Sequence, residues 1–223
     1  MAVISEKALS WAPIVKTELV RQSVPLPITL ILSLIDVESN GFPGLINKKS
    51  GAAGLMQVMP FVVDDYNKAT GKNYGPSDMS GKTDLDSTKQ IRVGIWILSK
   101  FWRSANRYLS KRFSSVPIDE LAKIADLFYV AGPGATRKRL DKLENPVFSN
   151  VEATFPKWNA LPHPKRVFDR FQNSGESFDL PAIQQWLSSD APKIEIEPEE
   201  GAAIGIAIIA IAWWFIASQK GVE

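Results

Sequence analysis

The side chain with the clearest chemical potential is Glu38, at the end of a strongly apolar segment, residues 28–39. A segment that is apolar nearly all round predicts a central, buried helix, and Asn40-Gly41 predicts its end. Burial and the negative end of the helix macrodipole both disfavour a carboxylate in that last turn. We therefore expect the neutral form that a general acid needs, although Glu38 taken alone is better explained as an exposed glutamate at a helix end.

Other ionisable side chains are weaker candidates. Asp36 precedes Glu38 by two residues, roughly 200° around the helix, so we do not expect the two carboxylates to act as a pair. The single histidine, His163, stands between two prolines, a pattern typical of a rigid surface turn. With one histidine and no cysteine, a multi-histidine metal site, a disulfide and thiolate chemistry are excluded, and no nucleophile elbow accompanies the histidine. We expect no metal and no cofactor.

The elements that must position Glu38 are helical. No strand pattern of any length appears, so the fold class is predicted to be mainly α. The N-terminal segment, residues 5–22, predicts an amphipathic helix that Pro13 kinks or splits. Beyond a glycine-rich stretch at 51–60 and a loop at 70–83, the pattern predicts helices at 86–110, 118–129, 136–143 and 165–171, with another short one at 181–188.

Four blocks together carry a family resemblance. Residues 38–43 read Glu-Ser-Asn-Gly-Phe-Pro, and residues 50–60 contain Gly-Ala-x-Gly-Leu-Met-Gln-x-x-Pro. Residues 128–134 read Phe-Tyr-Val-Ala-Gly-Pro-Gly, and residues 85–94 fit the intervening helix. This pattern resembles the lysozyme-like lytic transglycosylase family of the soluble type over residues 25–171. The resemblance implies a lysozyme-like domain that cleaves peptidoglycan.

The resemblance implies a role for each matching position. Glu38 would protonate the glycosidic oxygen between N-acetylmuramic acid and N-acetylglucosamine, and would then accept the proton of the muramoyl C6 hydroxyl as the 1,6-anhydro ring closes. No second catalytic carboxylate is needed, unlike in most glycosidases. Ser39, Met56 and Gln57 would contact or line the glycan site, and Tyr129 would orient Glu38 through its hydroxyl. The implied partner is the peptidoglycan glycan strand.

Two positions depart from the family pattern. Gln90 and Val130 stand where asparagine is usual. The first change is mild, whereas Val130 removes a polar group beside the expected glycan site. Two alternatives to the transglycosylase stay open. One is a muramidase-type hydrolase on the same fold, in which water replaces the C6 hydroxyl. The other is a structural membrane protein of a virion that has lost turnover, of which Val130 would be a symptom.

The C-terminal part of the sequence predicts a different environment. Residues 201–217 are all apolar or glycine, and at 1.5 Å per residue they span roughly 25 Å. This length is slightly short of a bilayer core, and Trp213-Trp214 suits its interface. We expect a lysozyme-like domain at 1–172, a linker at 173–200 and a single transmembrane helix at 201–218, which makes the lipid bilayer a second partner.

The expected topology creates a problem of location. No N-terminal signal pattern appears, so a C-terminal anchor would leave the domain on the side where it is made, which in bacteria holds no peptidoglycan. We expect a bacteriophage virion membrane, with other virion membrane proteins as candidate partners and local wall opening during entry as the role. The alternative location is the bacterial cell envelope. A net charge of +2 and the lack of a long basic run argue against nucleic-acid binding.

Overall fold

The computed structural model describes residues 3–189, and the predicted transmembrane helix at 201–218 lies outside them. Within the described part there is no named strand, only isolated bridges that join Ala53 to Ile46 and to Val58, which confirms a mainly α fold. No helix of this part is long and apolar enough to cross a membrane. The helices are α1 (Glu6–Leu9), α2 (Ala12–Arg21), α3 (Ile28–Ser39), α4 (Pro60–Thr70), α5 (Pro76–Ser80), α6 (Asp84–Leu109), α7 (Ile118–Ala131), α8 (Pro133–Leu140), α9 (Phe148–Thr154), α10 (Pro162–Asn173) and α11 (Leu180–Ser188).

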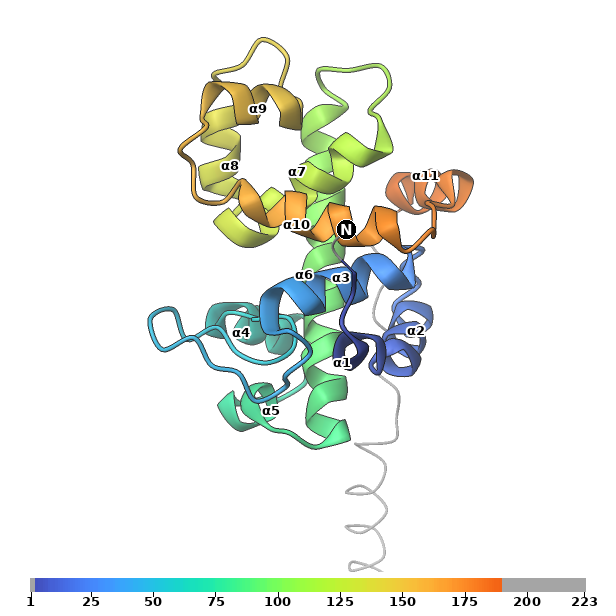
Figure 1. The fold of residues 1–223 in the computed structure, drawn as a ribbon, viewed down its shortest axis with the longest axis vertical. Helices are drawn as coiled ribbons and strands as arrows, with labels where there is room; N and C mark the ends of the chain where they lie inside the picture. Colours follow the sequence, from blue (N-terminus) through green and yellow to red (C-terminus); the bar gives the residue numbers. More distant parts are fainter. Residues whose placement is uncertain (1–2, 190–223) are drawn as a thin grey trace, which may run out of the picture. The chain divides into compact units, whose positions relative to one another are not determined.

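The 26-residue helix α6 runs through the middle of the described unit, and α3 and α10 cross it (Figure 1). It begins with a capping box, in which the side chains of Thr83 and Asp86 satisfy each other's main-chain N–H groups. Gly94 lets a neighbouring segment approach closely, because a Cβ there would lie 2.2 Å from the Met56 sulfur. The helix therefore serves as the axis against which the glycine-rich stretch packs.

Helix α3 has the bounds that its apolar pattern predicts, Ile28–Ser39. Pro27 precedes it, and Asn40 ends it in the left-handed conformation, with a φ of 52°. Its central residues from Leu30 to Ile35 are buried. The helix consequently presents Glu38 from a rigid, packed element rather than from a loop.

An ion pair buried between α2 and α6 anchors the N-terminal helices. The carboxylate of Glu18 accepts two hydrogen bonds from the Arg92 guanidinium, at 3.1 and 3.0 Å, and its side chain is 1% exposed. Arg92 also donates to the Tyr74 hydroxyl at 2.7 Å. The predicted N-terminal helix is divided into α1 and α2 at Ser10-Trp11, just before Pro13.

Helices α4 and α9 were not predicted, and α5 falls inside the predicted loop at 70–83. The folded unit also continues beyond residue 172. Ile183 and Trp186 of α11 are buried, and the Phe178 ring lies 4.8 Å from that of Phe171. The chain divides into the units Met1–Pro192 and Lys193–Glu223, so residues 173–189 belong with the folded unit, and the rest of the predicted linker at 173–200 lies outside the described residues.

Candidate active site

Glu38 lies at the end of α3 with its side chain 15% exposed, facing the first turn of α10. Its Oε1 is 3.1 Å from Nε2 of His163, whose side chain is 7% exposed. The two atoms are close enough for an ion pair, although they are not aligned as a hydrogen bond. Such contacts often tighten only when substrate binds.

The other ring nitrogen of His163 faces a second carboxylate. Nδ1 lies 2.8 Å from Oδ2 of Asp126, a buried residue of α7. The prediction of a surface turn for His163 is therefore wrong. Pro162 and Pro164 begin α10 instead, because residues in the first turn of a helix have no intrahelical partner for their N–H groups and proline is tolerated there.

The two carboxylates set the charge of the imidazole. Burial alone would lower the pKa of His163, but the charge and hydrogen bond of Asp126, together with Glu38, raise it to about 10. The histidine is therefore an imidazolium at neutral pH. The imidazole thus lies between the side chains of Asp126 and Glu38, and each of them faces one ring nitrogen.

Tyr129 belongs to the same face of α7 as Asp126. Its hydroxyl donates to the main-chain carbonyl of Met56, and no hydrogen bond to Glu38 is formed. Burial raises its pKa well above 10, and the charges of Glu38 and Asp126 add to the effect, so the hydroxyl stays neutral and able to donate. The predicted orientation of Glu38 by Tyr129 stays a prediction, and in this structure the hydroxyl holds the neighbouring glycine-rich stretch.

The glycine-rich stretch is fastened to α3 and α6 by buried hydrogen bonds. The Ser39 hydroxyl donates to the carbonyl of Leu55 at 2.8 Å, and Leu55 N–H donates to Oε1 of Gln90 at 3.0 Å. Gly54 has a φ of +79°, and a Cβ there would lie 2.6 Å from the same Gln90 oxygen. Ser39, which was predicted to contact the glycan, thus helps to fix the shape of this stretch.

The predicted glycan contacts differ in exposure. Ser39 and Met56 are buried, and the Met56 side chain packs on α6 at Gly94. Gln57 is partly exposed, with a φ of 45°, and its amide donates to the carbonyls of Leu45 and Gly54. Contact of these side chains with a saccharide stays a prediction.

Asp36, which we expected not to pair with Glu38, has other partners. Its carboxylate accepts hydrogen bonds from Nε of Arg170, at 2.6 Å, and from the hydroxyl of Ser5. Arg170 and His163 lie two turns apart on α10. This helix therefore contacts α3 at two acidic side chains, those of Asp36 and Glu38. Asp36 serves the packing of the helix that carries Glu38.

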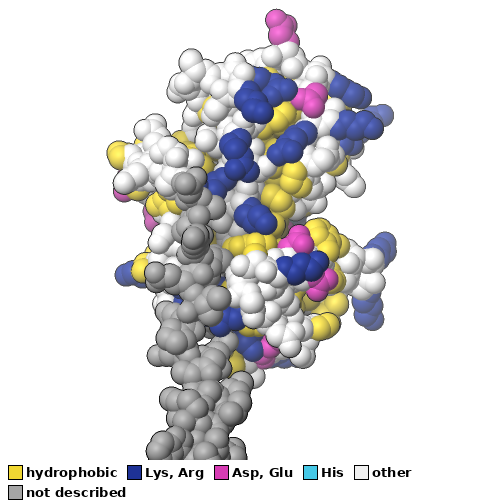
Figure 2. All heavy atoms as spheres, turned by 180° about the vertical axis from the view of Figure 1, so that it is seen from behind, with side chains coloured by type: hydrophobic (Ala, Val, Ile, Leu, Met, Phe, Trp, Pro, Cys, Tyr) yellow, Lys and Arg dark blue, Asp and Glu magenta, His cyan; other side chains and the backbone are white. Residues whose placement is uncertain are grey.

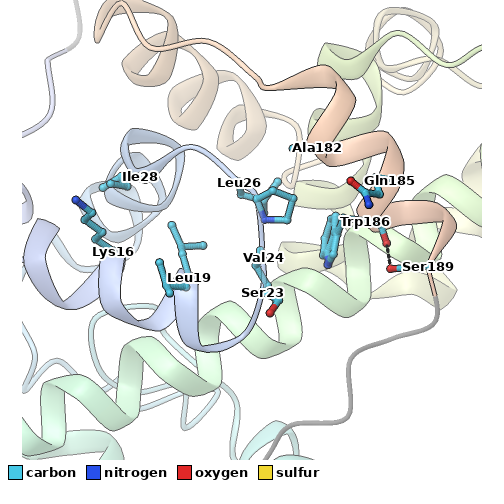
Figure 3. A pocket seen from close by; sticks show the side chains of 12 residues that line it. Lys16, Leu19, Ser23, Val24, Leu26, Ile28, Ala182, Gln185, Trp186 and Ser189 are labelled. Carbon is cyan, nitrogen blue, oxygen red and sulfur yellow. Dashed lines mark hydrogen bonds between the residues drawn. The ribbon is translucent and has the colours of Figure 1, made fainter.

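One large hollow of the described unit lies away from Glu38. A cavity of about 660 Å³ separates α2 and the start of α3 from α11, with Val24 and Leu26 on one side and Trp186 on the other (Figure 3). Another hollow, of about 350 Å³, is lined by Val130, which follows Tyr129 in the sequence, and by Ala160, which lies shortly before α10. Trp158 lines it as well, with the Arg139 guanidinium 4.2 Å from its ring.

Comparison with known families decides the classification. The family model described as Transglycosylase SLT domain matches residues 21–145, more than half of the chain. The chain belongs to this family. Members of the SLT family are lytic transglycosylases that act on peptidoglycan, which supports an enzyme of that class with peptidoglycan as its substrate. No curated protein matches the chain.

The SLT match contains Glu38, Asp126 and Tyr129, but it ends before α10. His163 therefore joins this SLT site from outside the matched segment. Sequence reasoning missed His163 and Asp126 as site residues. Asp126 lies three residues before Tyr129 on one helical face, and this spacing was the only local signal. No group of three or more His, Cys, Asp or Glu side chains in residues 3–189 is placed to hold a metal ion.

Proposed function

We propose that this SLT domain is a peptidoglycan lytic transglycosylase in which Glu38 is both general acid and general base. The observation that carries the proposal is the placing of Glu38: partly exposed, at the end of a rigid helix, beside an imidazolium. The nearby carboxylates of Asp36 and Asp126 are taken up by Arg170 and His163. One reactive carboxyl is what anhydro-ring formation requires.

The reaction can run on that single carboxyl group. Glu38 donates a proton to the glycosidic oxygen as the bond to the muramoyl C1 breaks, which leaves a carboxylate. The carboxylate accepts the proton of the C6 hydroxyl, whose oxygen bonds to C1 and closes the 1,6-anhydro ring. The proton returns to Glu38, so a turnover consumes neither water nor a net proton.

Mass spectrometry of digested peptidoglycan tests the proposed reaction. Transglycosylase products are lighter by one water than hydrolase products, because the anhydro ring replaces a reducing end. Reducing ends alone would support the muramidase alternative. If the wild type releases no more product than Glu38→Gln, the enzyme proposal fails and the inactive virion protein is favoured, provided that both variants show the same unfolding temperature.

The surface offers a reason for attraction to the wall polymer. On the side opposite to that of Figure 1, Lys and Arg side chains border a band of apolar side chains over the upper part, which contains α7, α8 and α9 (Figure 2). Helix α8 contributes Arg137, Lys138 and Arg139 in its last turn. The peptide stems of peptidoglycan carry carboxylates, so a basic face favours their approach at low salt.

The location that we propose is a membrane, with residues 201–218 as a single anchor. The apolar composition of this segment supports the proposal. We favour a bacteriophage virion membrane and local wall opening during entry, with the bacterial envelope as the alternative. Fractionation of purified virions and of host envelopes, probed with an antibody against the folded unit, distinguishes the two: detection only in the host envelope would exclude the virion.

A further inference from the structure

Three side chains from three helices, two of them buried and the third partly exposed, form a chain of contacts that ends at the proposed acid. Asp126 of α7 faces Nδ1 of His163 at 2.8 Å, and Nε2 faces Oε1 of Glu38 at 3.1 Å. The side chains of His163 and Asp126 are each 7% exposed, and that of Glu38 is 15% exposed. The exposed end of the chain is therefore the catalytic one.

The orientation of the imidazole is set by Asp126. A carboxylate at Nδ1 fixes a proton on that nitrogen and leaves Nε2 to exchange a proton with Glu38. The charged groups that act on His163 are Glu38 from α3 and Asp126 from α7. Tyr129 from α7 faces the same two carboxylates but stays neutral. Asp126 thus holds one ring nitrogen of His163, and the other ring nitrogen faces Glu38.

We propose that His163 is a positioning residue that holds the catalytic proton for Glu38, with Asp126 holding His163 in place. In the resting enzyme the proton is on Nε2, opposite a Glu38 carboxylate. It moves to Glu38 when a bound glycan excludes water, because a less polar surrounding favours the neutral pair over separated charges. The inference rests on the proposed function of Glu38.

The proton balance closes over one turnover. The proton leaves Nε2 for the Glu38 carboxyl and passes to the glycosidic oxygen as the C1–O bond breaks. The C6 hydroxyl then returns a proton to Glu38 as its oxygen bonds to C1, and that proton goes back to Nε2. Neither an oxidant nor an external acid is needed.

The single histidine of the chain makes a direct test possible. In protein made without a histidine tag, the imidazole nitrogen and carbon NMR shifts report only His163. We expect a titration midpoint well above 6.5 in the wild type. Glu38→Gln and Asp126→Asn should each lower it by about one pH unit or more, because each removes an opposing charge.

The NMR outcomes decide the geometry without any assay of activity. A wild-type midpoint near 6.5 would overturn the inference. So would an unchanged midpoint in Glu38→Gln alongside a lowered one in Asp126→Asn, since His163 would then be a structural partner of Asp126 only. Lys165→Gln, on the same helix as His163, is the matched control, because it breaks only an exposed ion pair with Glu152 of α9 and should leave the midpoint unchanged.

Kinetics on solubilised glycan strands test the catalytic part. His163→Gln keeps an N–H donor but cannot carry the proton, so kcat should fall roughly 10-fold or more with little change in KM. The alkaline limb of the kcat–pH profile should move to lower pH. His163→Gln with the kcat and pH profile of the wild type would sink the inference while leaving the proposed function intact. Failure of the proposed function would instead show as equal activity of the wild type and Glu38→Gln.

Discussion

The main-chain N–H of Leu55 donates to the buried side chain of Gln90, which reaches it from α6. The amide nitrogen of Gln90 also donates to the carbonyls of Asp78 and Gly81. One side chain thus ties the glycine-rich stretch, α5 and the start of α6 together. Asparagine is usual at this position in the family that the sequence resembles. The longer glutamine has hydrogen-bond partners at both its oxygen and its amide nitrogen.

Gln90→Ala should destabilise the domain and its site together. The change leaves the Leu55 N–H and two carbonyls without their partner, and an unsatisfied buried group costs about 1–3 kcal/mol. We expect the free energy of unfolding in urea to fall by at least about 2 kcal/mol, with a loss of glycan cleavage. The control is Lys89→Ala, at the residue just before Gln90. It removes a partly exposed ion pair with Asp78 and should lower the free energy of unfolding by less than about 1 kcal/mol. Equal stability of Gln90→Ala and the wild type would contradict the role of this side chain.

Glu18→Ala should be the more damaging of two changes to the ion pair between α2 and α6. It leaves the buried Arg92 guanidinium without a counter-charge, which typically costs about 3–5 kcal/mol. Glu18→Gln keeps the size and one acceptor and should cost less. Chemical denaturation of both variants at neutral pH measures the difference. An equal, small loss in both would show that water solvates Arg92 in the folded protein.

Helix α3 could be predicted from local pattern alone, whereas the role of Glu38 could be predicted only from the family resemblance. Pro27, a run of apolar residues and Asn40-Gly41 are short-range signals, and each acts in the structure as such signals do elsewhere. The limits of α10 could not be predicted in the same way. Pro162-His163-Pro164 suits both a turn and the first turn of a helix, and the choice depends on contacts with α3 and α7, which are distant in sequence.

The missed parts of the fold have similar causes. Helix α4 begins at Pro60, which also ends the glycine-rich block. Its polar residues make the apolar pattern of the buried positions Val62, Val63 and Tyr66 hard to detect in the sequence. Residues 173–189 are polar enough to suggest a linker, yet Glu176 accepts hydrogen bonds from Thr29 at the start of α3. Local composition does not reveal such tertiary contacts.

Tyr129→Phe should act mainly through the glycine-rich stretch. The lost hydroxyl leaves the Met56 carbonyl without its donor, so we expect a loss of about 1–2 kcal/mol in unfolding free energy. We also expect kcat to fall, because the glycine-rich stretch loses one of its hydrogen bonds. The amide NMR signals of residues 54–58 should shift for the same reason. A reduced kcat with unchanged loop signals and stability would instead indicate that the hydroxyl acts on Glu38 directly.

The stability of the domain should fall as the pH rises from neutral to alkaline. The pKa of His163 is raised to about 10 in the folded state, against 6.5 for a free histidine, so the folded protein holds this proton more tightly than the unfolded chain does. The stabilisation is complete below pH 6.5 and is lost as the pH passes through 10. Urea unfolding at pH 6.5, 8 and 10 should therefore show a decline in the wild type that His163→Gln lacks, with a lower starting value at pH 6.5. Lys165→Gln should keep the wild-type decline, because the pKa of Lys165 lies above this window. A wild-type stability that is flat between pH 6.5 and 10 would mean that the imidazolium is not favoured by folding, and that the two carboxylates do not act on His163 as their distances indicate.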